Sequence, residues 1–118
     1  MDKDMFIEQA AGRAEADLRI DNAMVADVFS GEFFPSSVCI GQGCILGFSR
    51  MPAREVTDAG GAYLLPGLID GHVHIESSML CPARFAELVL PRGTTTVIAD
   101  PHEIANVRGG DGIRYMLE

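Results

Sequence analysis

The sequence has 118 residues, and 47% of them are hydrophobic, which is enough for a core and excludes a chain disordered throughout. Its formal net charge of -8 at pH 7 argues against nucleic acid and anionic membrane as partners. The chain has no apolar run near the roughly 20 residues of a membrane helix, and its acidic start does not resemble a signal peptide. We therefore expect a cytoplasmic protein with no nucleic-acid partner and no membrane partner.

The first 15 residues have the spacing of a short amphipathic helix. Apolar side chains recur three or four positions apart, at Phe6, Ile7, Ala10, Ala11 and Ala14. Charged residues occupy most of the positions between them. Residues 1–15 are therefore predicted to form an N-terminal helix that packs against the rest of the chain.

Residues 16–63 change to short β-type runs separated by turns. The runs cover residues 18–20, 24–28, 38–40, 44–48 and 55–57. Glycine-containing connections between such runs, including Gly41-Gln42-Gly43, are typical of hairpins. The pattern predicts a small β-sandwich-like module, and its scattered polar residues indicate a scaffold.

Residues 64–118 open on a strand that has one polar, ligand-bearing face. After the break at Pro66-Gly67, Leu68 and Ile69 are expected to resume a buried run. Residues two apart in a strand point to the same face, and four ligand-type side chains have that spacing: Asp70, His72, His74 and Glu76. Two imidazoles on one face suit a single metal ion, so His72 and His74 are the candidate ligands. A His-x-His pair on a surface strand can also have no function.

Residues 77–99 complete a strand–helix–strand unit. The expected helix has a Ser77-Ser78 cap, Pro82 in its first turn, and a buried stripe of Phe85, Leu88 and Val89. Pro91-Arg92-Gly93 ends it, and the β-branched run 94–99 is predicted to be a buried parallel strand. The connection of roughly 15 residues is long enough for a βαβ crossover.

A second group of ligand-type residues follows this second strand. Asp100, His102 and Glu103 come directly after it. Functional groups in parallel α/β barrels gather at the carboxyl ends of strands, so these residues are expected to lie near His72 and His74. The alternative is structural, because an acidic residue at the start of a helix also interacts favourably with the helix dipole.

Several stretches resemble known families. The segment Pro66-Gly67-Leu68-Ile69-Asp70-Gly71-His72-Val73-His74 resembles the first-strand signature of the amidohydrolase superfamily. Residues 72–79 (HVHIESSM) and 92–107 (RGTTTVIADPHEIANV) are similar to the bacterial adenine deaminase family, as are residues 16–20, 27–32 and 112–116. The resemblance extends from about residue 5 to residue 118.

This resemblance implies hydrolytic deamination of adenine to hypoxanthine and ammonia, in a (β/α)8 barrel that carries a smaller β-domain. It also implies a divalent metal, manganese or iron before zinc, with His72 and His74 as ligands of the first ion. Glu76, Asp100, His102 and Glu103 would be pocket residues that orient the ligands or hold an extra metal. The complete enzyme is expected to be a homo-oligomer.

The length departs from the family pattern. A (β/α)8 barrel needs roughly 250 residues, whereas residues 64–118 supply two βα units and end in a helix that has barely begun. We therefore expect a truncated N-terminal portion that is inactive alone, with the main catalytic acid or base beyond residue 118. The alternatives are another cyclic-amide or nucleobase amidohydrolase, and a non-enzymatic β-module with a short α/β appendage.

Overall fold

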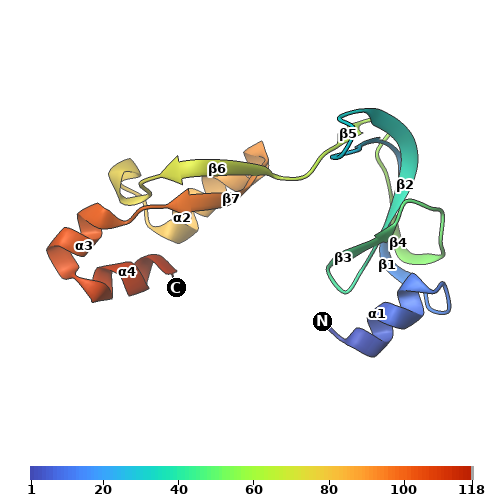
Figure 1. The fold of residues 1–118 in the computed structure, drawn as a ribbon, viewed down its shortest axis with the longest axis horizontal. Coiled ribbons are helices and arrows are strands. Elements are labelled where there is room, and N and C mark those ends of the chain that lie inside the picture. Colours follow the sequence, from blue (N-terminus) through green and yellow to red (C-terminus); the bar gives the residue numbers. More distant parts are fainter. Residues whose placement is uncertain (118) are drawn as a thin grey trace. The chain divides into compact units, whose positions relative to one another are not determined.

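The computed structural model describes residues 1–117, in which a mixed α/β chain forms two units, divided along the sequence between Pro66 and Gly67 (Figure 1). The first unit contains α1 (Lys3–Ala10), β1 (Ala16–Ala26), β2 (Phe33–Gly41), β3 (Cys44–Gly47), β4 (Ala53–Asp58) and β5 (Tyr63–Leu64). The second contains β6 (Leu68–Val73), the 3₁₀ turn η1 (Glu76–Ser78), α2 (Pro82–Val89), the 3₁₀ turn η2 (Leu90–Arg92), β7 (Thr94–Ala99), α3 (His102–Arg108) and α4 (Gly110–Leu117). None of the helices in this described range is both long enough and apolar enough to span a membrane.

Helix α1 is shorter than the predicted helix over residues 1–15. Asp2 caps its start, because Asp2 Oδ1 accepts hydrogen bonds from the main-chain nitrogens of Asp4 and Met5, at 3.0 and 3.2 Å. The helix ends at Ala10, and Gly12 then takes a left-handed conformation with φ of 71°. That conformation reverses the chain, which leaves Ala14 outside the helix.

The strands of the first unit form one mixed sheet in the order β3-β2-β1-β4, with β5 also paired to β1. Strand β1 runs antiparallel to β2 and parallel to β4 and β5. The two predicted runs 18–20 and 24–28 are therefore parts of one long strand, whose pairing shifts between Ile20 and Ala23 around the left-handed Asn22 (φ 56°). Because the continuous β1 pairs on both edges, the predicted β-sandwich-like arrangement is replaced by a single sheet in the residues described.

Two hairpin residues confirm the tight connection predicted between β2 and β3. Gln42 and Gly43 have φ values of 53° and 76°, so both lie in the left-handed region. Two successive residues of this kind give the turn that matches the twist of paired antiparallel strands.

A buried glutamine attaches α1 to this hairpin. Gln9 is fully buried, and its Nε2 donates hydrogen bonds to the main-chain oxygen of Glu15 and to Asp17 Oδ1, at 2.8 and 2.9 Å. The other carboxylate oxygen of Asp17 accepts a hydrogen bond of 2.7 Å from the main-chain nitrogen of Gln42. One carboxylate therefore connects the helix, the first strand and the hairpin turn.

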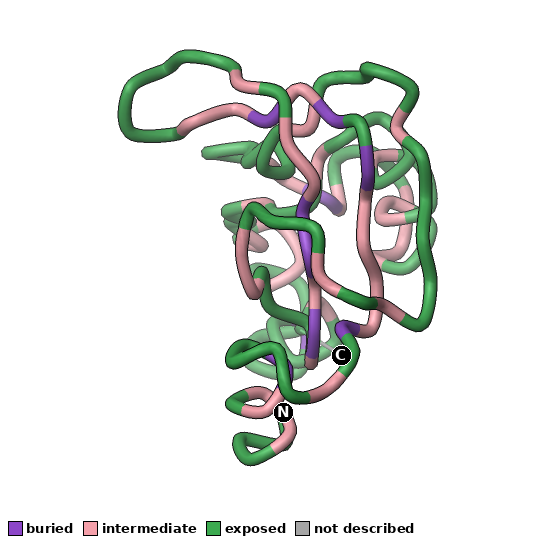
Figure 2. Tube along the Cα trace, turned by 90° about the vertical axis from the view of Figure 1, so that its right-hand side faces the viewer, coloured by how far each residue is buried: buried purple, intermediate pink, exposed green. Residues whose placement is uncertain are grey.

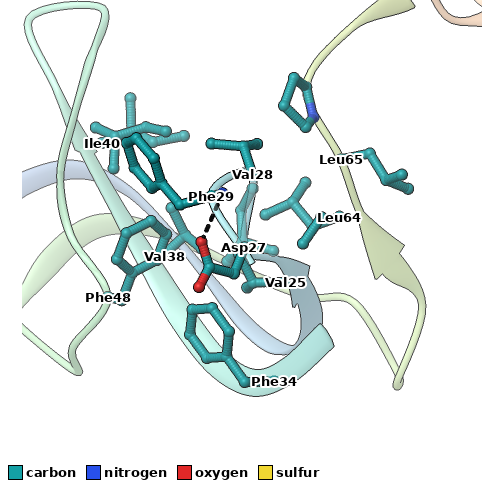
Figure 3. A pocket seen from close by; sticks show the side chains of 14 residues that line it. Val25, Asp27, Val28, Phe29, Phe34, Val38, Ile40, Phe48, Leu64 and Leu65 are labelled. Carbon is teal, nitrogen blue, oxygen red and sulfur yellow. Dashed lines mark hydrogen bonds between the residues drawn. The ribbon is translucent and has the colours of Figure 1, made fainter. Parts of the chain in front are cut away.

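The core of the first unit lies on β1 and β2, where Ala23, Val25 and Val38 are buried. Buried residues form only short stretches of the trace, and most of it is intermediate or exposed (Figure 2). Beside the core lies an apolar hollow of about 540 Å³, lined mainly by aliphatic and aromatic side chains that include Phe34, Phe48 and Leu64 (Figure 3). Within the hollow, Asp27 uses its carboxylate to accept a hydrogen bond of 2.9 Å from the main-chain nitrogen of Phe29. That bond accounts for the polar group in an otherwise apolar wall.

Asp21 is a second buried polar group of the first unit. Its carboxylate accepts hydrogen bonds from Arg19 at 2.8 and 3.0 Å, from Ser37 at 2.7 Å and from Arg50 at 3.2 Å. The hydrogen bonds from Arg19 and then from Ser37 lower the pKa of Asp21 from 3.8 to about 2.

This lowered pKa predicts that the first unit loses stability in acid. Between about pH 4 and about pH 2 the unfolded chain binds a proton at Asp21 that the folded chain does not, so stability falls as the pH falls through this window. Urea unfolding followed by circular dichroism from about pH 5 to about pH 2 measures the effect. An Asp21→Asn variant should be less stable at pH 5 and should show a flatter pH dependence. An equally steep dependence in the variant would contradict this role for Asp21.

In the second unit, β6 and β7 pair in parallel with α2 between them in sequence, which confirms the predicted strand–helix–strand order. Pro82 occupies the first turn of α2, as predicted. The predicted burial is wrong at several positions: Leu68, Ile69, Leu88 and Ile98 are 60%, 68%, 50% and 57% exposed. A two-stranded sheet has too few neighbouring elements to cover both of its faces, so apolar strands remain exposed.

Candidate metal centre

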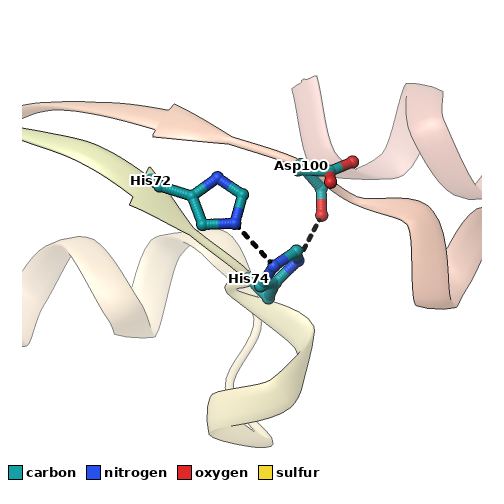
Figure 4. A group of neighbouring side chains, drawn as sticks. All are labelled: His72, His74 and Asp100. Atoms are coloured by element: carbon teal, nitrogen blue, oxygen red, sulfur yellow. Dashed lines mark hydrogen bonds between the residues drawn. The ribbon is translucent and has the colours of Figure 1, made fainter.

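The site begins where β6 ends. His72 lies in the strand, and His74 is the first residue after the strand ends. The two histidines are two positions apart, as predicted, and their imidazoles lie together (Figure 4). Their Nε2 atoms are 3.0 Å apart, and the ring centres are 4.7 Å apart. His72 is exposed, whereas His74 is partly buried. The two ring nitrogens therefore lie within hydrogen-bonding distance of each other, and the His72 side of the pair is exposed to solvent.

The end of β7 closes on these histidines. The main-chain nitrogen of Asp100 donates a hydrogen bond of 3.0 Å to the oxygen of Val73, which continues the pairing of the two strands. The main-chain oxygen of Asp100 then accepts a hydrogen bond of 2.7 Å from His74 Nδ1 (Figure 4). Parallel pairing thus brings the carboxyl ends of both strands to one edge of the sheet.

His102 completes a row of three imidazoles. It starts α3, and its ring centre lies 4.8 Å from that of His74. Its Nδ1 is 3.2 Å from Asp100 Oδ2, so the Asp100 side chain faces His102 while its carbonyl faces His74. The three histidines are the only ones in the sequence, and all of them lie in this cluster.

Two glutamates lie beside the imidazoles. Glu103 Oε1 accepts a hydrogen bond of 2.6 Å from the Ser77 hydroxyl, and Glu103 Oε2 lies 3.6 Å from His74 Nδ1. The Ser77 hydrogen bond is the main reason why the pKa of Glu103 is lowered. Glu76 Oε1 accepts a long bond of 3.5 Å from the main-chain nitrogen of Ile104. The second carboxylate oxygens of Glu76 and Glu103 are both buried without a hydrogen-bond partner.

Two details, at Glu76 and at Ser77, differ from the sequence prediction. Glu76 does not continue the strand alternation, because Ile75 has helical dihedrals and Glu76 starts η1. Asp70 accepts a hydrogen bond of 3.1 Å from the main-chain nitrogen of His72. Ser77 does not cap α2, whose N-cap is Cys81, but contacts Glu103 instead. The contact of Ser77 joins residues 26 apart, so only a three-dimensional arrangement reveals it.

The donor set fits a divalent cation. Two groups have potential ligand atoms within 4.8 Å of one another: His72, His74 and Asp100, and His74, His102 and Glu103. Imidazole nitrogens and carboxylate oxygens are ligands of manganese, iron and zinc in proteins. Buried carboxylate oxygens without partners are costly unless a cation or a proton donor satisfies them. The residues present could therefore hold a divalent cation.

The known proteins that this sequence resembles are amidohydrolases, adenine deaminases among them. The amidohydrolase family matches residues 63–118. The adenine deaminase of Nitratidesulfovibrio vulgaris (strain DP4) is 60% identical over 113 residues, which are 96% of this chain and 20% of that protein. The adenine deaminase of Bacillus pumilus (strain SAFR-032) is 52% identical over 100% of this chain and 21% of its own length. The chain thus spans about a fifth of the length of these curated relatives.

A solved structure with the same fold is L-hydantoinase (dihydropyrimidinase) from Arthrobacter aurescens. It matches 73% of this chain and 21% of its own chain, with a TM-score of 0.58 and 24% sequence identity. At this identity the likeness concerns the fold alone.

Proposed function

This chain is a homologue of the adenine deaminases, with residues 63–118 in the amidohydrolase family, and on that premise we propose that it serves the hydrolytic deamination of adenine. In this reaction water adds its oxygen to C6 of the purine, the bond from C6 to the amino nitrogen breaks, and hypoxanthine and ammonia are released. The observation that carries the proposal is the meeting of His72, His74 and Asp100 at the carboxyl ends of two parallel strands.

His72 and His74 would hold the cation through their Nε2 atoms, which face each other at 3.0 Å. A bound divalent metal supplies Lewis acidity, which makes water a nucleophile at neutral pH. The Asp100 carbonyl orients the His74 ring from the other side, at 2.7 Å. Glu76, His102 and Glu103 would shape the pocket behind these ligands, and their lone pairs make that side of the pocket attractive to positive charge.

The metal, the complete barrel and the oligomeric state are proposed by analogy with the same family. We propose manganese or iron as the metal, with zinc as a substitute, because mixed imidazole and carboxylate donors accept all three. The strand pair β6 and β7 would be the first two strands of a (β/α)8 barrel, of which α2 would be the first outer helix. A homo-oligomeric enzyme of purine metabolism in the cytoplasm completes the proposal.

A chimeric enzyme tests the function. This chain would replace the corresponding fifth of the Nitratidesulfovibrio vulgaris adenine deaminase, to which it is 60% identical. We expect the chimera, loaded with Mn²⁺, to deaminate adenine with a kcat/KM within about tenfold of the parent enzyme, a difference of ~1.4 kcal/mol. Release of ammonia and loss of adenine absorbance measure the rate.

The controls separate the alternatives. The 118-residue chain is assayed in parallel, together with the parent enzyme lacking the same fifth. If a folded, metal-loaded chimera hydrolyses a cyclic amide or another nucleobase but not adenine, that compound would replace adenine as the proposed substrate. A folded chimera that binds metal and hydrolyses none of these would contradict the enzymatic proposal.

A further inference from the structure

We infer that Ser77 and Glu103 act as positioning residues, which together hold the His74 ring with its proton on Nδ1 and its Nε2 free to bind the cation. The inference rests on the proposed function only in assuming that the site binds a cation. The arrangement itself is read from contacts between three separate elements, the end of β6, η1 and the first turn of α3. Nothing in the spacing of the sequence places a serine behind the metal ligands.

The Asp100 carbonyl fixes where the proton of His74 lies. A carbonyl oxygen only accepts hydrogen bonds, so at 2.7 Å from it the Nδ1 atom of His74 must be the donor. A neutral imidazole with its proton on Nδ1 has its lone pair on Nε2. That Nε2 is the atom that faces His72. In this structure that lone pair accepts a hydrogen bond of 3.0 Å from His72 Nε2, and a cation bound on the His72 side would take the place of that proton.

Glu103 reinforces this arrangement with charge. Its Oε2 is buried, has no hydrogen-bond partner, and lies 3.6 Å from the same Nδ1. A carboxylate on the Nδ1 side of a histidine favours a proton at that atom and makes Nε2 a stronger ligand. Ser77 holds the carboxylate in place, because its hydroxyl donates a bond of 2.6 Å to the other oxygen.

This assignment changes the interpretation of the second ligand group. His74, His102 and Glu103 have the spacing of a cation site, but the His74 nitrogen nearest to Glu103 carries a proton and cannot bind metal at the same time. Glu103 thus supports the ligand His74 from behind and is not a ligand of a separate ion. The proton on Nδ1 leaves His74 one nitrogen for a cation, Nε2, and that nitrogen lies on the His72 side.

Solid-state nitrogen NMR of the 118-residue chain labelled with ¹⁵N-histidine tests the tautomer directly, and it does not require a monomeric sample. Only three histidines contribute signals, so His72→Ala and His102→Ala variants assign them. At about pH 8, where an ordinary imidazole is neutral, we expect His74 to give the pattern of a ring protonated at Nδ1. In Glu103→Ala and Ser77→Ala only the Asp100 carbonyl still favours the proton on Nδ1, so the pattern should move part of the way toward an average of the two tautomers. An averaged ring, or one protonated at Nε2, in the unsubstituted chain would overturn the inference.

Zn²⁺ affinity in the chimeric enzyme gives a second measurement, which does not depend on how the short chain behaves alone. Competition with a chelating dye should show a loss of about 10- to 100-fold for Glu103→Ala, the range for partners behind metal ligands. Glu103→Gln keeps a polar oxygen on the Nδ1 side of His74 but loses the negative charge, so it should lose less than Glu103→Ala. Glu87→Ala, at an exposed glutamate that pairs with Arg84 on α2, is the matched control.

The two readouts leave clear outcomes. Unchanged affinity in both Glu103→Ala and Ser77→Ala would overturn the inference, as would an equal loss in Glu87→Ala. Neither readout uses adenine, so a correct tautomer and affinity in a chimera inert toward adenine would reject the proposed function and keep the positioning role.

Discussion

Replacement of either His72 or His74 by alanine in the chimeric enzyme should abolish metal-dependent turnover of adenine. Each histidine contributes one Nε2 atom to the proposed cation site, and the two atoms are 3.0 Å apart. With one nitrogen missing, the remaining protein donors hold the cation less tightly, and the Lewis acidity on which the reaction depends is lost. We expect kcat/KM to fall by more than ~100-fold, beyond the loss typical of partners behind a ligand.

Metal analysis separates this effect from a general loss of fold. Metal per protomer and adenine turnover are measured on the same preparation, with circular dichroism as the check of folding. His102→Ala is the informative comparison, because the His102 Nδ1 faces the Asp100 carboxylate at 3.2 Å and not His72. It should cost less activity than either ligand variant. Near-parental activity with full metal content in His72→Ala or His74→Ala would refute the ligand assignment.

The 118-residue chain alone should self-associate in solution. Ile69 on β6 and Ile98 on β7 are 68% and 57% exposed, and the two-stranded sheet also has unpaired edges. Exposed apolar strands with free edges pair with other chains. We therefore expect oligomers or aggregates in size-exclusion chromatography with light scattering, and a larger monomer fraction for the Ile69→Lys/Ile98→Lys double variant.

A helix position provides the control for this second effect. Val107 on α3 is 81% exposed, so Val107→Lys removes a comparable apolar surface outside the strands. It should change the distribution of species little. A parent chain that elutes as a single monomer and melts cooperatively would contradict the prediction, and so would an equal gain of monomer from Val107→Lys.

Local signals predicted the elements better than they predicted the layers. Pro82 at a helix start and the left-handed pair Gln42-Gly43 depend on neighbours in sequence, and both are found where the residues indicate. The single sheet of the first unit could not be predicted in this way. Its central strand passes through Asn22 without ending: β2 pairs with it before and after Asn22, and on the other side β5 pairs with it after the pairing with β4 has stopped at Asp21. Burial failed for a related reason: β-branched runs indicate a strand, whereas its exposure depends on which elements cover it.

The same distinction applies to the site. The spacing of His72 and His74 follows from the period of a strand, and Asp100 follows from the rule for carboxyl ends. Asp100 contacts His74 through its main-chain oxygen, which every residue has. The identity of the residue therefore could not predict this contact. Ser77 behind Glu103 likewise depends on how η1 and α3 meet, which no local pattern encodes.

The Asp17 carboxylate makes the opening of the N-terminal region a cooperative event. It accepts hydrogen bonds from the Gln9 side chain and from the main chain of Gln42, and the main-chain nitrogen of Asp2 donates to the Gln42 side chain. If the helix frays, Asp17 loses the hydrogen bond from Gln9. If the hairpin opens, Asp17 loses the hydrogen bond from Gln42. Amide protons of both segments should therefore exchange with solvent at linked rates, as one unit of local unfolding.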